Sequence, residues 1–526
     1  MIRRPFILAT SLCSALALTA CPGPAPRPTT QPTMASKGAR KPPQTATKVD
    51  PWAKAKLIEA PEPVPAQALK LPPVKRFKLR NGLSGLALPD DQLPLVSVRL
   101  TLPVGSIDDP ADRVGLADFT AMMLRQGAAG MSAERISQRV DAAGARLSVS
   151  PGYEITTITC RAQAKDLDLC LEMVSALVSR PTFPKKEMAQ VTRSLEGEVR
   201  SDRDDPSMLV AKHFYNLLYG DDHPAGRPLT LGSIAAVKRK DLQRFFATYY
   251  RPQGAVLAVS GAVDIKTLDK RVARRFRRWR KGKRPPRKAV TVKSPGPGLK
   301  VLLIDKPDLT QSFFMIGHAG VNLRHADRDA LRLVDYVLGG GGFSSRLMKV
   351  VRSKGGKTYG ISSAFYAHEA DGLFRVRSST RNAELWRTLE LARGELQRVR
   401  KEPPTAAELV AAKGKLAGGY AIRFKTGDQL AAALSLAQVR GLGDRYVSEL
   451  PLRIQRLEVS TVAAAAKKHV KPGALVLAVV GKGSVVAPLL DKAKVRYERI
   501  DYLAPISAKA RRRAKESIVI SPAEAK

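Results

Sequence analysis

The stretch that decides the fold of this chain is Gly105–Gly127, which reads GSIDDPADRVGLADFTAMMLRQG. It follows Leu95–Leu102 (LVSVRLTL), in which apolar and polar residues alternate as they do in a strand with one buried face. Gly105 ends that strand, and the residues after it predict a helix that continues to Gln126. Strand and helix in succession indicate a layered fold that contains both.

The first half of the chain continues with a regular series of elements. They are a helix at Ser132–Ala143, strand-like alternation at Ala145–Arg161, and helices at Asp166–Ser179 and Lys185–Arg200. The second half repeats the series. It has a strand at Gln311–Gly317, a helix at Arg328–Leu338, glycines and a helix at Ser344–Ser353, alternation at Ser362–Ser378, and helices at Ala383–Lys401 and Thr405–Phe424.

The two halves also end alike. Tyr250–Gly261 (YRPQGAVLAVSG) and Val470–Gly481 (VKPGALVLAVVG) each feed a Pro-containing turn into an apolar strand that stops at Gly. The repetition predicts two homologous α+β domains that arose by internal duplication, each with an antiparallel sheet covered by helices.

This prediction divides the chain into six segments. They are a signal peptide (1–20), a Pro-rich tether (21–73), a first domain (74–276), a basic linker (277–297), a second domain (298–490) and a basic tail (491–526), which we expect to be disordered from about Ala504.

The N-terminus has the layout of a targeting segment. Arg3 and Arg4 precede the apolar run Ile7–Leu18, and the following LTAC resembles a bacterial lipobox with Cys21 as the lipidated residue. We therefore expect a lipid-anchored protein of the bacterial cell envelope, on the outer membrane and facing the periplasm. An ordinary signal peptide with an incidental Cys is the alternative.

Cysteine content and charge give weaker indications. Cys160 and Cys170 remain once Cys13 and Cys21 are set aside, and although an oxidising envelope permits a bridge, we expect two buried thiols. The net charge of +42 would attract nucleic acid, anionic lipid or acidic peptide. Secretion makes nucleic acid a poor partner, and the densest basic run, Arg271–Lys288, is interpreted as solvated linker.

Several segments resemble the pitrilysin/insulinase family of zinc metallopeptidases over roughly 74–490. Gly105–Gly127 resembles its zinc-site helix, Leu195–Pro206 (LEGEVRSDRDDP) the segment with the third zinc ligand, and Asp222–Leu229 (DHPAGRPL) its His-Pro-x-Gly-x-Pro turn. Leu338–Leu347 (LGGGGFSSRL) resembles the family's second glycine turn. The resemblance implies the two-domain fold of that family.

The zinc-site helix of active members carries HxxEH, and this chain departs from it. The two His positions are Asp118 and Met122, the water-activating Glu is Ala121, and the third ligand position is Glu198. A thioether is a poor ligand for zinc, and Ala121 can neither accept nor donate a proton. We therefore expect no metal in this chain. Glu198 is then most simply a polar residue on an exposed or cavity-facing helix.

The second half keeps the family's substrate-binding pattern. In Val350–Gly360 (VVRSKGGKTYG), Arg352 and Tyr359 match the Arg that binds the substrate backbone and the Tyr that stabilises the oxyanion. Without the resemblance, Arg352 is equally a cation at a helix C-terminus and Tyr359 an aromatic residue at a strand edge. The six His residues form no HxxxH or HxxE pair and are interpreted as surface or capping residues.

Loss of the zinc ligands with retention of Arg352 and Tyr359 resembles the zinc-less partner in bacterial and mitochondrial processing-type peptidases. The resemblance implies a subunit that is inactive alone, pairs with an HxxEH-bearing homologue that holds the zinc, and acts on peptides. Two alternatives stay open: a stand-alone peptide-binding or scaffold lipoprotein, and a basic protein that contacts anionic lipid or polysaccharide through Arg271–Lys288.

Overall fold

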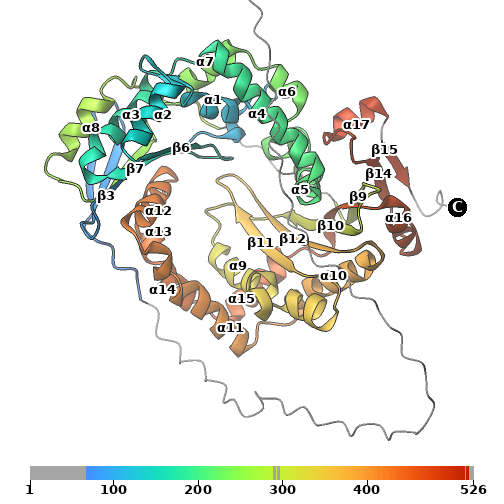
Figure 1. The fold of residues 1–526 in the computed structure, drawn as a ribbon. Helices are drawn as coiled ribbons and strands as arrows, with labels where there is room; N and C mark the ends of the chain where they lie inside the picture. The colour runs from blue at the N-terminus through green and yellow to red at the C-terminus, as the bar shows by residue number, and fades with distance from the viewer. Residues whose placement is uncertain (1–66, 288–291, 293–295, 516, 521–526) are drawn as a thin grey trace, which may run out of the picture. The chain divides into compact units, whose positions relative to one another are not determined.

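The computed structural model of the protein describes residues 67–287, 292, 296–515 and 517–520. The first half of the described chain contains these helices and strands (Figure 1): β1 (Lys75–Lys78), β2 (Ser84–Pro89), β3 (Leu95–Leu102), α1 (Leu116–Leu124), β4 (Gly127–Ala128), β5 (Met131–Ser132), α2 (Ala133–Ala142), β6 (Arg146–Ser150), β7 (Thr156–Gln163), α3 (Leu167–Ser179), α4 (Lys185–Asp204), α5 (Pro206–Tyr219), α6 (Leu231–Ala235), α7 (Arg239–Tyr249), β8 (Val256–Gly261) and α8 (Leu268–Phe276).

The second half contains β9 (Gly298–Asp305), β10 (Gln311–Ala319), α9 (Arg328–Asp335), β11 (Ile361–Ala367), β12 (Gly372–Arg381), α10 (Leu385–Lys401), α11 (Ala406–Lys413), α12 (Gly427–Val439), α13 (Arg445–Ser448), α14 (Leu450–Gln455), α15 (Val459–His469), β13 (Ala474–Gly481), α16 (Gly483–Lys492), β14 (Tyr497–Asp501), α17 (Ala508–Ala514) and β15 (Ser517–Ile520). Within the described residues, π-helical turns follow α9 at Tyr336–Gly340 and α11 at Gly414–Gly418, and another lies at Met348–Lys354.

The two large sheets repeat one topology. The first has the order β1-β2-β8-β3-β7-β6, and the second has β11-β12-β10-β13-β9-β14-β15. Read from the opposite edge, β9-β13-β10-β12-β11 of the second sheet repeats β2-β8-β3-β7-β6 of the first. Both sheets are largely antiparallel, with a parallel pair at β2–β8 and its counterpart β9–β13, and the second sheet has a further parallel pair at β9–β14. The predicted α+β fold with two homologous halves is confirmed.

Each sheet is covered on one face by helices of its own half. On the other face, each half supplies a helix to the sheet of the other half. Helix α5 packs Leu209, Phe214 and Leu218 against the second sheet, in a core that includes Leu302 and Val476. In return, α12 packs Leu430 and Leu434 against strands β2 and β8 of the first sheet. This exchange joins the two halves through buried apolar surface, which is the main source of stabilisation at such contacts.

Most predicted elements are present with small changes at their ends. The strand at Leu95–Leu102 is confirmed at both ends because its alternate residues, Val96, Val98, Leu100 and Leu102, fill the core. The single helix predicted for 405–424 is wrong, since α11 ends at Lys413 and is followed by a π turn and a short 3₁₀ helix at Ala421–Phe424. Three glycines in 414–419 lower the helix propensity there.

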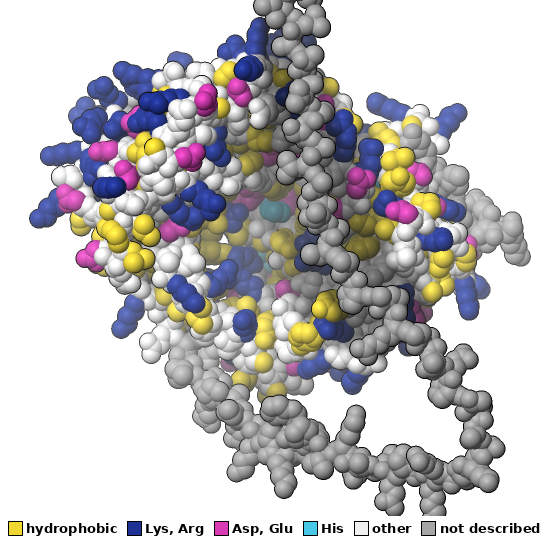
Figure 2. Space-filling model, in the orientation of Figure 1, with side chains coloured by type: hydrophobic (Ala, Val, Ile, Leu, Met, Phe, Trp, Pro, Cys, Tyr) yellow, Lys and Arg dark blue, Asp and Glu magenta, His cyan; other side chains and the backbone are white. Residues whose placement is uncertain are grey.

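We had expected the basic run Arg271–Lys288 to be a solvated linker. The structure contradicts this for its first part. Its first third forms the end of α8, and Val272, Phe276 and Trp279 are buried. Trp279 donates a hydrogen bond to the carbonyl of Tyr250 at 3.0 Å. Exposed Lys and Arg side chains are spread over the face seen in Figure 2, with acidic side chains among them.

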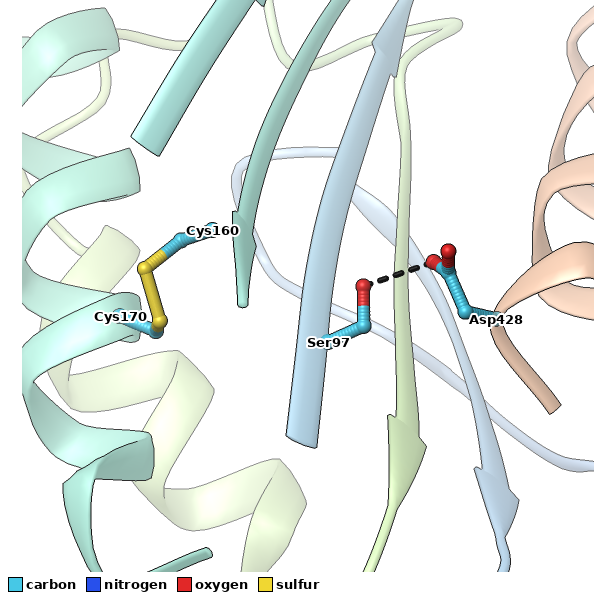
Figure 3. Close-up of a disulfide and its surroundings, with 4 residues drawn as sticks. All are labelled: Ser97, Cys160, Cys170 and Asp428. Carbon is cyan, nitrogen blue, oxygen red and sulfur yellow. Dashed lines mark hydrogen bonds between the residues drawn. A yellow bond between two sulfur atoms is a disulfide. The ribbon is translucent and has the colours of Figure 1, made fainter. Parts of the chain in front are cut away.

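Cys160 and Cys170 form a disulfide, so the expectation of two free thiols is wrong. The bridge joins β7 to α3 with a Cα–Cα distance of 5.4 Å, within the range that a disulfide requires. Figure 3 shows it on one side of the first sheet, while Ser97 on β3 points to the other side and donates a hydrogen bond of 2.7 Å to Asp428 of α12. The first sheet is thus linked to α3 by a disulfide on one face and to α12 by a hydrogen bond on the other.

The chain from Ala504 is ordered where the structure describes it, contrary to the expectation. Strand β14 pairs with β9, α17 follows, and Arg511 is buried with an ion pair to Glu498 at 3.0 Å. The predicted signal peptide, lipidation residue Cys21 and tether to residue 66 lie outside the described residues. None of the described helices has the length and hydropathy needed to cross a bilayer.

Candidate functional site

Helix α1, which corresponds to the zinc-site helix, is held by an aspartate outside it. The helix begins after Gly115, which has a positive φ of 91°. Glycine has no side chain that could cap the first turn. The carboxyl group of Asp109 accepts hydrogen bonds from the backbone N–H groups of Gly115 and Ala117, both at 2.7 Å. Burial raises the pKa of Asp109 to about 8, against the opposing effect of those two N–H groups. The segment Gly105–Gly115 therefore fixes where α1 starts.

The degenerate zinc positions lie together. Helix α1 packs against α4, which brings Asp118 near Glu198. Burial and, to a smaller extent, the negative charge of Glu198 together raise the pKa of Asp118 to about 6. Ala121 is fully buried, and Met122 packs at the edge of the hydrophobic core. The predicted frame is thus retained, with two carboxyl groups close enough for one to act on the pKa of the other.

These residues do not fit a catalytic zinc ion. Such a site needs about three nitrogen, sulfur-thiolate or carboxylate ligands and one open position. Here only Asp118 and Glu198 offer ligand oxygens, since Met122 is a thioether. Within the described residues, they are not part of any group of three or more His, Cys, Asp or Glu side chains close enough to hold one ion. Ala121 leaves no base to activate water.

Arg352 and Tyr359, predicted to bind substrate, are brought together in space. The guanidinium of Arg352 contacts two rings, 4.9 Å from the centroid of Tyr359 and 4.5 Å from that of Phe343. Phe343 follows the glycine turn and was not identified from the sequence. Both rings are unusually open to solvent, with 87% of Tyr359 and 67% of Phe343 exposed. The three side chains form an exposed aromatic and cationic cluster.

Local structure sets the position of this cluster. Arg352 lies in the π-helical turn Met348–Lys354, a helix form that is frequent at functional sites. The loop that carries Tyr359 is held by Thr358, whose hydroxyl contacts the carbonyls of Gly360 and Ser379 at 3.0 and 2.6 Å. The glycine turn is equally constrained, because a Cβ on Gly339 would lie 2.5 Å from the backbone nitrogen of Ser363.

The cluster and the degenerate zinc positions are separate within this chain. Among the described residues, no hydrogen bond, ion pair or ring contact joins Arg352 or Tyr359 to Asp118 or Glu198. In the part of the chain that the structure describes, the guanidinium of Arg352 also has no carboxylate partner, so its N–H donors are available to bind another group. The chain therefore presents an exposed Arg/Tyr pair that does not contact the degenerate zinc positions.

A buried polar contact between the two halves was missed by sequence reasoning. The tip of the β6–β7 hairpin supplies Glu154, whose carboxylate accepts hydrogen bonds from the backbone N–H of Glu369 (2.7 Å) and from Arg440 (3.1 Å). Arg287 donates to the carbonyl of Glu154 at 2.6 Å and to the carboxylate of Glu369 at 3.1 Å. The tip of one hairpin is thereby joined to the turn between β11 and β12.

Two of the His residues have capping roles, and others are buried rather than on the surface. His223 accepts a hydrogen bond from the backbone N–H of Ala225 and pairs with Asp371 at 3.1 Å, and His325 accepts one from the N–H of Asp327. In contrast, His213 and His318 are buried, and burial lowers their pKa values to about 3 and 4. The capping interpretation holds for His223 and His325, while the burial of His213, His318 and His469 contradicts a surface position.

Comparison with known proteins agrees with this geometry. Two family models match the chain: "Insulinase (Peptidase family M16)" over residues 86–230 and "Peptidase M16 inactive domain" over residues 236–416. An uncharacterized zinc protease of Mycobacterium leprae is 28% identical over 390 residues, which is 73% of this chain and 86% of that protein. Mouse cytochrome b-c1 complex subunit 2 is 22% identical over 426 residues, covering 79% of this chain and 91% of that protein.

The solved structures give the same answer for the fold. The crystal structure of a peptidase M16 inactive domain from Pseudomonas fluorescens matches with a TM-score of 0.71 and 26% identity, covering 78% of this chain and 98% of that one. A duplicated α+β fold with an exposed Arg/Tyr pair and a zinc helix without ligands defines an inactive metallopeptidase homologue. The chain belongs to the M16 (pitrilysin/insulinase) family and is homologous to its non-catalytic subunits.

Proposed function

We propose that this chain is the non-catalytic subunit of a zinc metallopeptidase of the cell envelope. It pairs with an HxxEH-bearing homologue, which holds the zinc, and supplies Arg352 and Tyr359 for peptide cleavage. The observation that carries the proposal is the exposure of Tyr359 beside an Arg352 that has no carboxylate partner among the described residues. A structural ion pair or a core aromatic would have neither property.

The chemistry of the pair suits peptide hydrolysis. A guanidinium presents several N–H donors in a fixed fork and can bind the carbonyls of an extended peptide. Its position over the two rings limits its rotation and offsets part of the entropy cost of ordering it. A phenol donates to the developing oxyanion without losing its own proton near neutral pH. The metal and the base come from the partner subunit.

The location in the envelope rests on separate observations. We infer a lipid on Cys21 from the lipobox-like LTAC, and such a lipid would anchor the protein to the outer membrane facing the periplasm. The disulfide between Cys160 and Cys170 supports this, because disulfides persist in the periplasm and are rare in the cytosol.

The test is peptide cleavage by a mixture of this chain and the HxxEH-bearing homologue from the same genome. We expect the mixture to cleave faster than either chain alone. Tyr359→Phe should lower kcat by about 10²-fold or more, as loss of one oxyanion donor does. Arg352→Lys should mainly raise KM. The matched control is Tyr366→Phe, which removes another partly exposed phenol of the same half.

Two results would contradict the proposal. One is a mixture no faster than the zinc-bearing chain alone. The other is an equal loss of activity in Tyr366→Phe and Tyr359→Phe. If, in addition, the isolated chain bound peptides in the presence of a chelator, the result would favour the stand-alone peptide-binding lipoprotein.

A further inference from the structure

Two helices of the second half bring together three side chains that could bind a metal. Helices α9 and α15 pack against each other, and the end of α15 meets the start of α9. His469 is the last residue of α15, Asp327 is the residue before α9, and His325 lies two positions earlier in the same turn. Asp327 and His469 are 142 positions apart, so no spacing motif reveals them.

The ligand atoms of these residues converge. His469 Nε2 lies 2.7 Å from Asp327 Oδ2, and His325 Nδ1 lies 3.9 Å from the same oxygen. One ligand atom from each residue can be chosen so that all three lie within 4.8 Å of one another. The two imidazole rings are nearly perpendicular, at 86°, so they do not stack on each other. This is the only such group of His, Cys, Asp or Glu in the described part of the chain.

The set of ligand atoms selects a class of metal. Two imidazole nitrogens and one carboxylate oxygen suit Zn²⁺, Ni²⁺, Co²⁺ or Cu²⁺, whereas Ca²⁺ and Mg²⁺ take oxygen ligands. Ligands about 2.0–2.1 Å from a tetrahedral zinc are roughly 3.4 Å apart. His469 and Asp327, at 2.7 Å, would therefore move apart on binding, and His325 and Asp327, at 3.9 Å, would move closer together. The side chains are partly exposed, at 32% for His325, 28% for Asp327 and 10% for His469. They can therefore adjust, and water can fill a fourth position.

The present contacts are ones that a cation can replace. The proton between His469 and Asp327 occupies the direction in which a metal would lie, and the N–H of Asp327 occupies His325 Nδ1 at 3.1 Å. Lys468 donates to Asp327 Oδ2 at 3.0 Å and already places a positive charge there. Lys468 is 64% exposed, so its flexible side chain can move into solvent when a divalent ion binds.

We propose that His325, Asp327 and His469 bind one divalent transition-metal ion, of which Zn²⁺ is the probe, and that this ion ties the end of α15 to the start of α9. The site lies in the second half of the chain and is distinct from the degenerate zinc positions on α1 and α4. Its role is structural, since its three ligands join the end of α15 to the start of α9. It does not depend on the proposed peptidase function.

The variants can remove the ligands and keep the structural hydrogen bonds. In His325→Asn, the amide oxygen can still accept the N–H of residue 327, as Asn side chains do two residues before a helix. In His469→Gln, the amide can still donate to Asp327. His368→Gln is the matched control, because His368 is also partly exposed and lies outside the cluster. Asp118→Asn reports on the degenerate zinc positions.

The experiment is calorimetric titration of the purified full chain with Zn²⁺, together with thermal unfolding with and without the ion. We expect one ion to bind, a loss of at least tenfold in affinity in His325→Asn and in His469→Gln, and no change in His368→Gln or Asp118→Asn. Zn²⁺ should raise the Tm of the wild type and not that of the double variant. Binding that survives in the double variant, or that is lost in Asp118→Asn, would overturn the proposal.

Discussion

Arg287 binds Asp108 through two parallel hydrogen bonds, Nε to Oδ1 and Nη2 to Oδ2, each 3.0 Å long. Arg287 comes from the basic segment between the two halves, and Asp108 precedes the helix that corresponds to the zinc-site helix. The Asp108 side chain is 2% exposed. The same guanidinium also contacts the carbonyl of Pro103 and the carboxylate of Glu369. One side chain thus bonds the connection, the first half and the second half together.

We expect Arg287→Ala to destabilise the fold by about 3–5 kcal/mol, because it leaves Asp108 buried without its cation. Arg287→Lys should recover only part of this, since an ammonium cannot form the paired bonds. Arg280→Ala, in the exposed part of the same segment, should change stability by less than about 0.5 kcal/mol. Denaturant unfolding measures all three. Equal losses for Arg287→Ala and Arg280→Ala would show that charge alone matters.

The disulfide between Cys160 and Cys170 should contribute about 2.5 kcal/mol, as expected for a loop of this length closed in the unfolded chain. The double variant Cys160→Ala with Cys170→Ala should therefore unfold at a lower temperature than the oxidised wild type. A reductant should lower the Tm of the wild type and leave that of the double variant unchanged. A reductant effect of the same size in both would mean that the bridge does not stabilise the native state.

The retained frame on α1 predicts that zinc binding can be restored. Asp118→His with Met122→His places two imidazoles one turn apart on a helix whose neighbour carries Glu198. Three ligands then converge, and we expect one Zn²⁺ more per chain than in the wild type, measured by elemental analysis after dialysis. Asp118→His alone should not retain the ion. No additional zinc in the double variant would show that α1 and α4 no longer hold the family's geometry.

Stability should depend on pH through Asp335, which precedes the glycine turn in the sequence. Burial raises its pKa to about 7, against the effect of the hydrogen bond of 2.6 Å from Ser363. The folded state therefore binds this proton up to a higher pH than the unfolded chain does. Stability contributed by the protonated group is lost as pH rises from about 4 to 7, and it stays low above that.

Asp335→Asn should remove this loss, because an amide keeps the bond from Ser363 and does not ionise. We expect the variant to be more stable than the wild type by about 1–2 kcal/mol at pH 8 and by little or nothing at pH 4. Tm values at the two pH values measure the effect, with the exposed Asp308→Asn as control. A gain that is the same at both pH values would rule out ionisation as the cause.

Local patterns predicted the elements well, because burial on one face imposes a period that the residues must follow. Leu95–Leu102 is correct at both ends for this reason. The same patterns did not show that α5 packs against the second sheet and α12 against the first. An apolar stripe says that a helix buries one face, and it does not say which sheet lies opposite.

The candidate site divides in a similar way. The family resemblance singled out Arg352 and Tyr359, and the structure brings these two side chains into contact. Phe343, which also contacts the guanidinium, was missed, since the glycine turn brings it back to Arg352 from nine positions earlier. The disulfide was missed because its sulfurs meet only when α3 folds back on β7.

The sequence by itself determined the duplicated α+β fold and the absence of zinc ligands from α1, because periodicity and residue chemistry are written along the chain. The tertiary structure alone decided the exchange of α5 and α12, the buried position of Arg287, and the meeting of His325 and Asp327 with His469. Each of these joins residues that are distant in sequence, and such contacts depend on which surfaces bury each other when the whole chain folds.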